Sequence, residues 1–262
     1  MIYVSGVFFR RISCLNYKTA PYKTQNPMNI LIIGATSGIG KELLNQYVVQ
    51  GHSVIACGRR ENILNELSTQ NSSVQGVQLD ICDIDSTSQT ISGLFAQTRI
   101  DIAIVTAGIG DLNPTLDNTI ELNTLQTNVV AWTNCVDLLY NAFQKQGFGH
   151  LVLITSVVGL RGEPVAPAYS ASKAYQMNYA EALKKKAFKN FPSLTITEIR
   201  PGLVDTAMAK GDGLFWVMPT SIVVKQILRA INKKMQICVV TKRWRIVHFI
   251  MRYLPWGLYK RI

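Results

Sequence analysis

The chain lacks the covalent and metal-binding features that hold many small or secreted proteins together. Its 262 residues include five cysteines, at positions 14, 57, 82, 135 and 238, which are scattered, odd in number and mostly set in apolar runs. No CxxC pair and no metal-ligand spacing of the three histidines is present. We therefore expect reduced core cysteines in a cytoplasmic protein without a metal site.

Long hydrophobic runs are also absent. No segment approaches the roughly 20 uninterrupted apolar residues that a membrane-spanning helix requires. The length of 262 residues suits one α/β domain with a single sizeable core, and it leaves little room for a second domain.

Acidic residues are missing from both ends of the chain. Every Asp and Glu lies between Glu42 and Asp212, so the formal charge of +11 belongs to two basic tails and the middle is nearly balanced. There is no helix-turn-helix, zinc or RNA-binding signature, and we expect no nucleic-acid partner. Basic tails suit a membrane surface or a phosphate-bearing ligand.

Residues 1–28 lack clear periodicity and form an N-terminal extension to the domain at 29–241. They have three interpretations: a targeting peptide, a short membrane-affine arm, or upstream sequence ahead of a start at Met28. Residues 242–262 form a separate basic tail.

Within 29–241, short β-branched runs alternate with longer helical patterns. Strands are predicted at 30–33, 53–57, 74–79, 101–106, 150–155, 194–199 and 236–240, and helices at 41–50, 122–146 and 169–191. Nearly continuous apolar strands separated by helices predict an α/β fold of the Rossmann type: one domain with a doubly wound parallel sheet of about seven strands.

A glycine-rich turn follows the first predicted strand. "ILIIGATSGIGKELL" places Gly34, Gly38 and Gly40 between that strand and the next helix. Glycines at this point allow a tight turn, and they let backbone N–H groups and the helix N-terminus approach a phosphate. The strand before and the helix after favour a nucleotide-binding turn.

The end of the second predicted strand bears on which nucleotide binds. "VIACGRR" supplies Arg59 and Arg60 at the position where an NAD site places a ribose-binding carboxylate. Arginine suits a 2′-phosphate, so we predict NADP(H), with NAD(H) as the less favoured cofactor. The alternative is a solvated basic turn.

A tyrosine and a lysine stand four residues apart in "YSASK", from Tyr169 to Lys173. On a helix these two side chains are neighbours, and a nearby ammonium lowers the pKa of a phenol toward neutral pH. Tyr169 would then serve as a general acid or base. Chance occurrence of this spacing on a helix is the alternative.

These segments, taken in order, resemble the short-chain dehydrogenase/reductase family. The resemblance covers about residues 29–240. Its motifs are "GATSGIG", "LDICD", "TAG", "QTNVV", "LITSVVG", "YSASK" and "RPGLVDTAM". Two departures stand out: Ile33 replaces the usual threonine before the first glycine, and Val105 and Thr106 replace two asparagines.

The resemblance implies four catalytic residues. Tyr169 would exchange a proton with the substrate oxygen, and Lys173 would lower its pKa and hold the nicotinamide ribose. Ser156 would hydrogen-bond the substrate oxygen. Asn128 would anchor a water that links Lys173 to solvent.

The resemblance also implies the cofactor contacts. These are Gly34, Thr36, Ser37, Gly38, Ile39, Gly40, Arg59, Arg60, Asp80, Ile81, Ala107, Gly108, Asn128, Tyr169, Lys173, Pro201, Gly202, Val204 and Thr206.

One segment bears on the identity of the substrate. The family's mobile lid corresponds to "AKGDGLFWVMPTS", where Leu214, Phe215, Trp216 and Met218 favour a hydrophobic alcohol or ketone, unless they simply pack on the core.

Residues 242–262, read as a helix, place Arg245, His248 and Arg252 in a polar stripe. Beside it lie the apolar residues Trp244, Val247, Ile250, Met251 and Leu254. Such a basic amphipathic helix fits peripheral contact with an anionic membrane, and a dimer contact or a cover over the sheet are its alternatives.

The sequence therefore predicts an NADP(H)-dependent oxidoreductase that interconverts a carbonyl and an alcohol. Family analogy suggests a homodimer or homotetramer through the two long helices. Two alternatives are a non-catalytic dinucleotide sensor and a membrane-recruited interaction protein.

Overall fold

The computed structural model describes residues 26–206 and 216–261. Seven parallel strands form one sheet in the order β3-β2-β1-β4-β5-β6-β7. Their bounds are β1 Asn29–Ile33, β2 Ser53–Gly58, β3 Val74–Gln78, β4 Ile102–Val105, β5 Gly149–Ile154, β6 Leu194–Pro201 and β7 Ile237–Val240. The predicted doubly wound sheet is confirmed, and each predicted strand overlaps an observed one.

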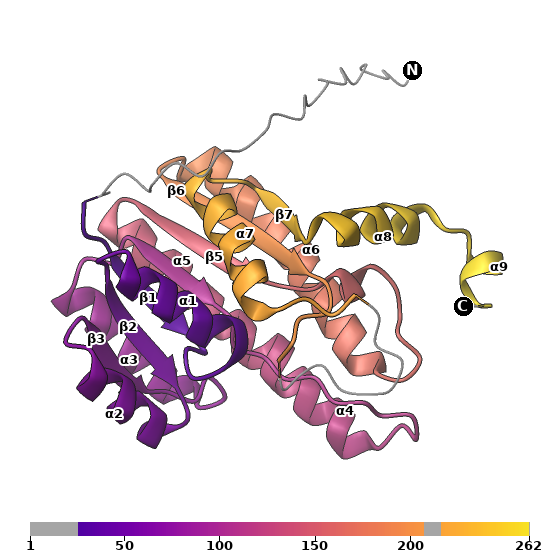
Figure 1. The fold of residues 1–262 in the computed structure, drawn as a ribbon, viewed down its shortest axis with the longest axis horizontal. Helices are drawn as coiled ribbons and strands as arrows, with labels where there is room; N and C mark the ends of the chain where they lie inside the picture. Colours follow the sequence, from indigo (N-terminus) through magenta and orange to yellow (C-terminus); the bar gives the residue numbers. More distant parts are fainter. Residues whose placement is uncertain (1–25, 207–215, 262) are drawn as a thin grey trace.

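Helices cover both faces of the sheet (Figure 1). They are α1 Gly38–Val49, α2 Glu61–Gln70, α3 Ile84–Gln97, α4 Asn118–Leu125, α5 Trp132–Gln146, α6 Pro167–Asn190 and α7 Thr220–Asn232. A π-helical segment, η1 Gln126–Ala131, joins α4 to α5, and a 3₁₀ turn, η2 Val157–Leu160, follows β5. The predicted helix at 122–146 therefore contains a π-helical interruption.

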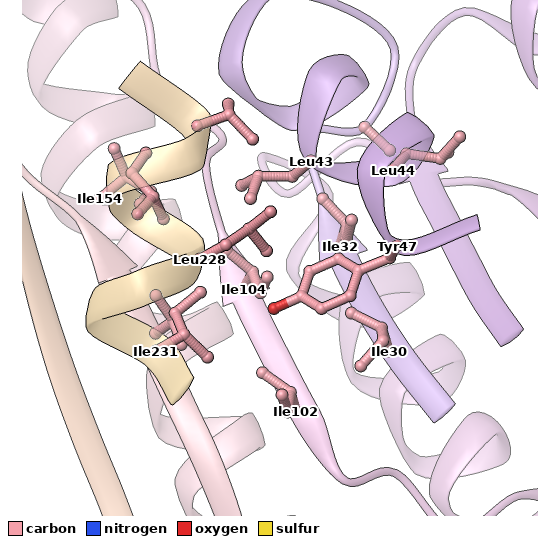
Figure 2. Packing of buried hydrophobic residues seen from close by; sticks show 14 of the residues in the cluster. Ile30, Ile32, Leu43, Leu44, Tyr47, Ile102, Ile104, Ile154, Leu228 and Ile231 are labelled. Carbon is pink, nitrogen blue, oxygen red and sulfur yellow. The ribbon is translucent and has the colours of Figure 1, made fainter. Parts of the chain in front are cut away.

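The core has two halves, one on each face of the sheet. On the first face the strands pack against α1, α2 and α7, and Figure 2 shows Tyr47 of α1 among Ile30, Ile102 and Ile231. On the second face they pack against α3, α5 and α6. Burial on both faces explains why the strands are apolar throughout instead of alternating.

The predicted helix in the basic tail is present as α8 Lys242–Tyr253, and a short α9 Trp256–Tyr259 follows it. In Figure 1 both helices (yellow) extend beyond β7 at one end of the sheet. Within the described ranges, no helix combines the length and apolar character needed to cross a membrane.

Candidate active site

The predicted site residues meet at the carboxyl ends of the strands. A cavity of about 780 Å³ opens there, at the edge where the chain order reverses between β1 and β4. In sheets of this kind ligands bind at that reversal. Every cofactor and catalytic residue predicted above lines this cavity except Asn128, which is fully buried behind it.

The glycine turn leads from β1 into α1. Gly34 has a φ of 98°, and a Cβ atom there would lie 2.5 Å from Oγ1 of Thr106, so only glycine fits. The Thr106 hydroxyl donates to the carbonyl oxygens of Ile33 and Gly34, at 3.0 Å each. Thr106 thus keeps the polar support of this turn despite its departure from the family pattern, whereas Val105 is buried in the core.

Arg59 and Arg60 are exposed at the rim of the cavity, beyond the end of β2. The Arg60 guanidinium donates to Oγ1 of Thr36 from Nε at 3.2 Å and from one terminal nitrogen at 2.9 Å. This contact draws Arg60 toward the glycine turn. The turn and the two cations together fit a phosphate-bearing nucleotide.

Ser156 and Tyr169 come together from the start of η2, just after β5, and from α6. Ser156 caps the 3₁₀ turn η2, where its Oγ accepts a hydrogen bond from the Val158 N–H at 3.2 Å. Burial raises the pKa of Tyr169, and a hydrogen bond with Ser156 acts in the opposite direction. The lowered pKa expected from the Tyr169–Lys173 spacing is therefore wrong for this arrangement, because burial removes the water that would stabilise the phenolate.

Lys173 lies on α6 one turn beyond Tyr169, and only 5% of its surface is exposed. Its Nζ is 5.8 Å from the centroid of the Tyr169 ring and donates to Oε1 of Gln176 at 2.9 Å. Burial lowers the pKa of Lys173 to about 8. The predicted proximity of the two side chains is thus present in the structure.

Asn128 lies in the π-helical segment η1 and contacts the catalytic region from behind. Its side chain accepts from the Ile109 N–H at 2.9 Å and donates to the Ile109 carbonyl at 2.7 Å and to Oγ of Ser172 at 3.1 Å. Its backbone carbonyl accepts from Nε2 of Gln176 at 2.8 Å. The Gln176 amide therefore joins Lys173 to the Asn128 backbone. The water that Asn128 would anchor between Lys173 and solvent stays a prediction.

Sequence reasoning missed Gln176. The residue stands three positions after Lys173, on the same helical face, and is fully buried. That spacing was a usable signal. The acceptor of its amide, however, is a backbone carbonyl 48 residues away, which no local pattern reveals.

The inner face of α8 forms one wall of the cavity. Trp244, Val247, His248 and Met251 line it, together with Tyr259 of α9. Trp244, Val247 and Met251, three of the apolar residues predicted beside the polar stripe, face the site. On this side the helix covers the end of the sheet, as one of the three interpretations of the tail had it. Trp244 is 6% exposed.

The wall is close-fitting at Gly202, because a Cβ atom there would overlap the Trp244 indole. His248, expected in an exposed polar stripe, lies 3.0 Å from a terminal nitrogen of Arg200. Part of the predicted lid, including Leu214 and Phe215, lies outside the described residues.

A buried group of charges supports this wall. Glu198 is fully buried in β6, and its carboxylate pairs with Arg200 at 2.7 Å and with Lys184 at 2.9 Å. The hydroxyl of Thr155 also donates to Glu198 at 3.2 Å. Arg200 therefore joins the sheet interior to His248 and so to α8.

A doubly wound parallel sheet with a glycine turn after β1, and with serine, tyrosine and lysine around one cavity, defines a dinucleotide-dependent oxidoreductase. The family model described as short chain dehydrogenase matches residues 28–213. The chain belongs to this family and is an NAD(P)-dependent oxidoreductase of it.

The relatives agree with this assignment. The chain is 31% identical over 216 residues to an uncharacterized oxidoreductase of Mycobacterium tuberculosis, covering 78% of this chain and 85% of that one. It is 28% identical over 203 residues to dehydrogenase/reductase SDR family member 7B of Xenopus tropicalis, covering 70% and 64%.

Solved structures share the fold. A short chain dehydrogenase from Burkholderia cenocepacia in complex with NADP superposes with a TM-score of 0.79 at 19% identity, covering 90% of this chain and 97% of that one. A short-chain dehydrogenase from Sphingobium yanoikuyae in complex with NADPH gives 0.74 at 23% identity, covering 90% and 96%.

Proposed function

We propose that this protein is an NADP(H)-dependent oxidoreductase that interconverts a hydrophobic ketone or aldehyde and its alcohol. One observation carries the proposal: Ser156, Tyr169 and Lys173 line the same cavity as the glycine turn and the two arginines at its rim. The cofactor would supply the hydride, and the protein residues would position the substrate and move the proton.

Tyr169 is the proton donor in this proposal. Its raised pKa keeps the phenol protonated at neutral pH, which suits donation to a carbonyl oxygen that gains negative charge. The hydroxyl of Ser156, held at the start of η2, donates a hydrogen bond to the same oxygen. The phenolate left behind is stabilised by the ammonium of Lys173.

Cofactor preference follows from the charge beyond β2. Arg59 and Arg60 favour the ribose phosphate of NADP(H), and no carboxylate in the segment "VIACGRR" competes for a ribose hydroxyl. Both structural relatives described above carry NADP or NADPH, which supports the same preference.

The apolar wall of the cavity supports a hydrophobic substrate. Val158 and Leu160 of η2 face the same cavity as Trp244, Val247 and Met251 of the C-terminal helix. Against this apolar surface, the hydroxyls of a sugar would lack hydrogen-bond partners.

We also propose that the protein forms homodimers or homotetramers through the two long helical segments. Leu122, Leu125 and Val130 on α4 and η1 are exposed large apolar side chains that a second copy would cover.

The experiment that tests the function follows oxidation of NADPH, at the nicotinamide absorbance, with a panel of ketones, aldehydes and acyl substrates. Replacing Tyr169→Phe should reduce turnover roughly 10²–10⁴-fold, the usual contribution of a general acid, while NADPH binding persists. Activity that survives this replacement would exclude the mechanism.

A further inference from the structure

The outer face of α8 carries an exposed apolar stripe. Ile246, Phe249, Ile250 and Tyr253 are spaced i, i+3, i+4 and i+7, so they share one side of the helix. Each is between 52% and 66% exposed. The side that lines the cavity carries the same spacing but starts two residues earlier, at Trp244. An offset of two residues is a rotation of about 200° around a helix, so the stripe lies on the opposite side.

The exposed apolar surface continues into α9. Trp256 is 68% exposed and Leu258 is 54% exposed. The side chains of Trp256 and Tyr259 contact each other as a tilted ring pair. Tryptophan and tyrosine are enriched where protein meets the headgroup region of a bilayer.

Basic side chains from α8 and from the end of α9 flank this surface. Segment 242–262 contains no Asp or Glu. All of its basic residues other than His248 are exposed, and among the described residues none of these forms an ion pair with a carboxylate. They are Lys242, Arg243, Arg245, Arg252, Lys260 and Arg261.

Contacts from the body of the protein fix the orientation of α8 and α9. Arg161 donates from Nε to the Met251 carbonyl at 2.9 Å and also hydrogen-bonds the Leu254 carbonyl, which satisfies the end of α8. The hydroxyl of Tyr259 donates to the Gly162 carbonyl at 2.5 Å. The apolar stripe therefore faces outward while the inner face stays against the cavity.

We propose that α8 and α9 dock on an anionic lipid bilayer, with the stripe in the headgroup boundary and the six basic residues on acidic headgroups. Charge complementarity selects this occupant, because acidic headgroups attract basic residues near the surface and the apolar side chains add area-dependent affinity. A hydrophobic face alone would also suit a protein partner. Six cations without an acid favour anionic lipid.

The docking has a consequence for the substrate, which rests on the proposed function. The helix that lies on the bilayer also walls the cavity, so the enzyme would take a long-chain, membrane-dissolved carbonyl or alcohol from the lipid side. The hydrophobic substrate of the proposed function would then be a molecule dissolved in the lipid bilayer.

The test is flotation of the full chain, with NADPH present, on phosphatidylcholine vesicles with and without phosphatidylserine. We expect the bound fraction to rise about tenfold or more with phosphatidylserine and to fall at 0.5 M NaCl, because added salt screens exposed charges. The paired replacement Phe249→Glu and Ile250→Glu should abolish this gain.

The matched control is Phe188→Glu. Phe188 on α6 is 81% exposed and stands among lysines, so it tests whether any exposed aromatic in a basic setting suffices. The control should float like the wild type. Thermal melting and NADPH binding check that all variants are folded.

Three results would overturn the proposal. These are equal flotation with and without phosphatidylserine, an equal loss in the Phe188 variant, and a shift from dimer to monomer in the Phe249/Ile250 variant with unchanged flotation. The last result would make the stripe a contact between copies of this chain.

The lipid-borne substrate has a separate readout. Phosphatidylserine vesicles should lower the KM for a long-chain ketone at least about tenfold in the wild type but not in the Phe249/Ile250 variant. A small water-soluble ketone should show no change in either. Failure of the enzyme with every ketone would contradict the proposed function and leave the flotation result intact.

Discussion

Nζ of Lys173 donates to Oε1 of Gln176 at 2.9 Å, so a buried amide holds the ammonium of Lys173 in place. Nε2 of the same amide donates to the Asn128 carbonyl at 2.8 Å. Since both ends of the amide are occupied, Gln176 cannot rotate without breaking a buried hydrogen bond. We infer that Gln176 is a positioning residue for Lys173.

Two different replacements of Gln176, by Leu and by Glu, should shift the alkaline limit of activity in opposite directions. Gln176→Leu removes an acceptor that favours the ammonium, so the pKa of Lys173 should fall and the alkaline limb of the kcat/KM profile should shift to lower pH. Gln176→Glu adds a negative charge and should shift that limb to higher pH. A purely structural role would lower activity in both variants without opposite shifts.

Burial of Lys173 should make stability depend on pH in a defined window. Because burial lowers its pKa from 10.5 to about 8, the folded protein releases this proton before the unfolded chain does. Below pH 8 both states keep the proton and the burial penalty opposes folding in full. Between about pH 8 and 10.5 the penalty is relieved.

The wild type should therefore gain stability with rising pH, relative to Lys173→Met, by about 3 kcal/mol across that window. Urea unfolding of both proteins at pH 7.5 and pH 10, without cofactor, measures the difference. A stability gap between the two proteins that stays constant with pH would mean that Lys173 titrates normally.

Removing the two rim arginines should weaken NADPH binding selectively. Hydrogen bonds to charged groups contribute roughly 1.5–3 kcal/mol. Arg59→Ala together with Arg60→Ala should thus raise the KM for NADPH roughly tenfold to a hundredfold. The KM for NADH serves as the internal control and should change little, whereas equal losses for both cofactors would show that the arginines support the glycine turn.

Within the buried charge group, replacement of Glu198 should lower the free energy of unfolding most. Glu198→Gln leaves Arg200 and Lys184 with weakened partners inside the protein, and breaking a buried ion pair costs about 3–5 kcal/mol. We expect a loss of that order in the free energy of unfolding by urea. Glu181→Gln, on the exposed side of α6, should stay within about 0.5 kcal/mol of the wild type, and a similarly small loss at Glu198 would contradict the prediction.

Local sequence patterns were enough to predict the sheet and most of the candidate site. The apolar strands, the glycines after β1 and the spacing of Tyr169 and Lys173 each express a local constraint: hydrophobic periodicity, backbone freedom or the helical repeat. The carboxyl ends of parallel strands meet at one edge of the sheet. That rule brings Ser156, Tyr169 and the glycine turn together without further information.

Other features of the site depend on contacts between distant segments, and only the tertiary structure determined them. The acceptor of the Gln176 amide lies on another helical segment, and the pKa of Tyr169 is raised by burial, which depends on the packed fold. Helix α8 is apolar on two opposite sides, so its periodicity leaves open which side faces inward. Arg161 and Arg200, brought to α8 by the fold, turn the Trp244 side to the cavity and leave the Phe249 side outside.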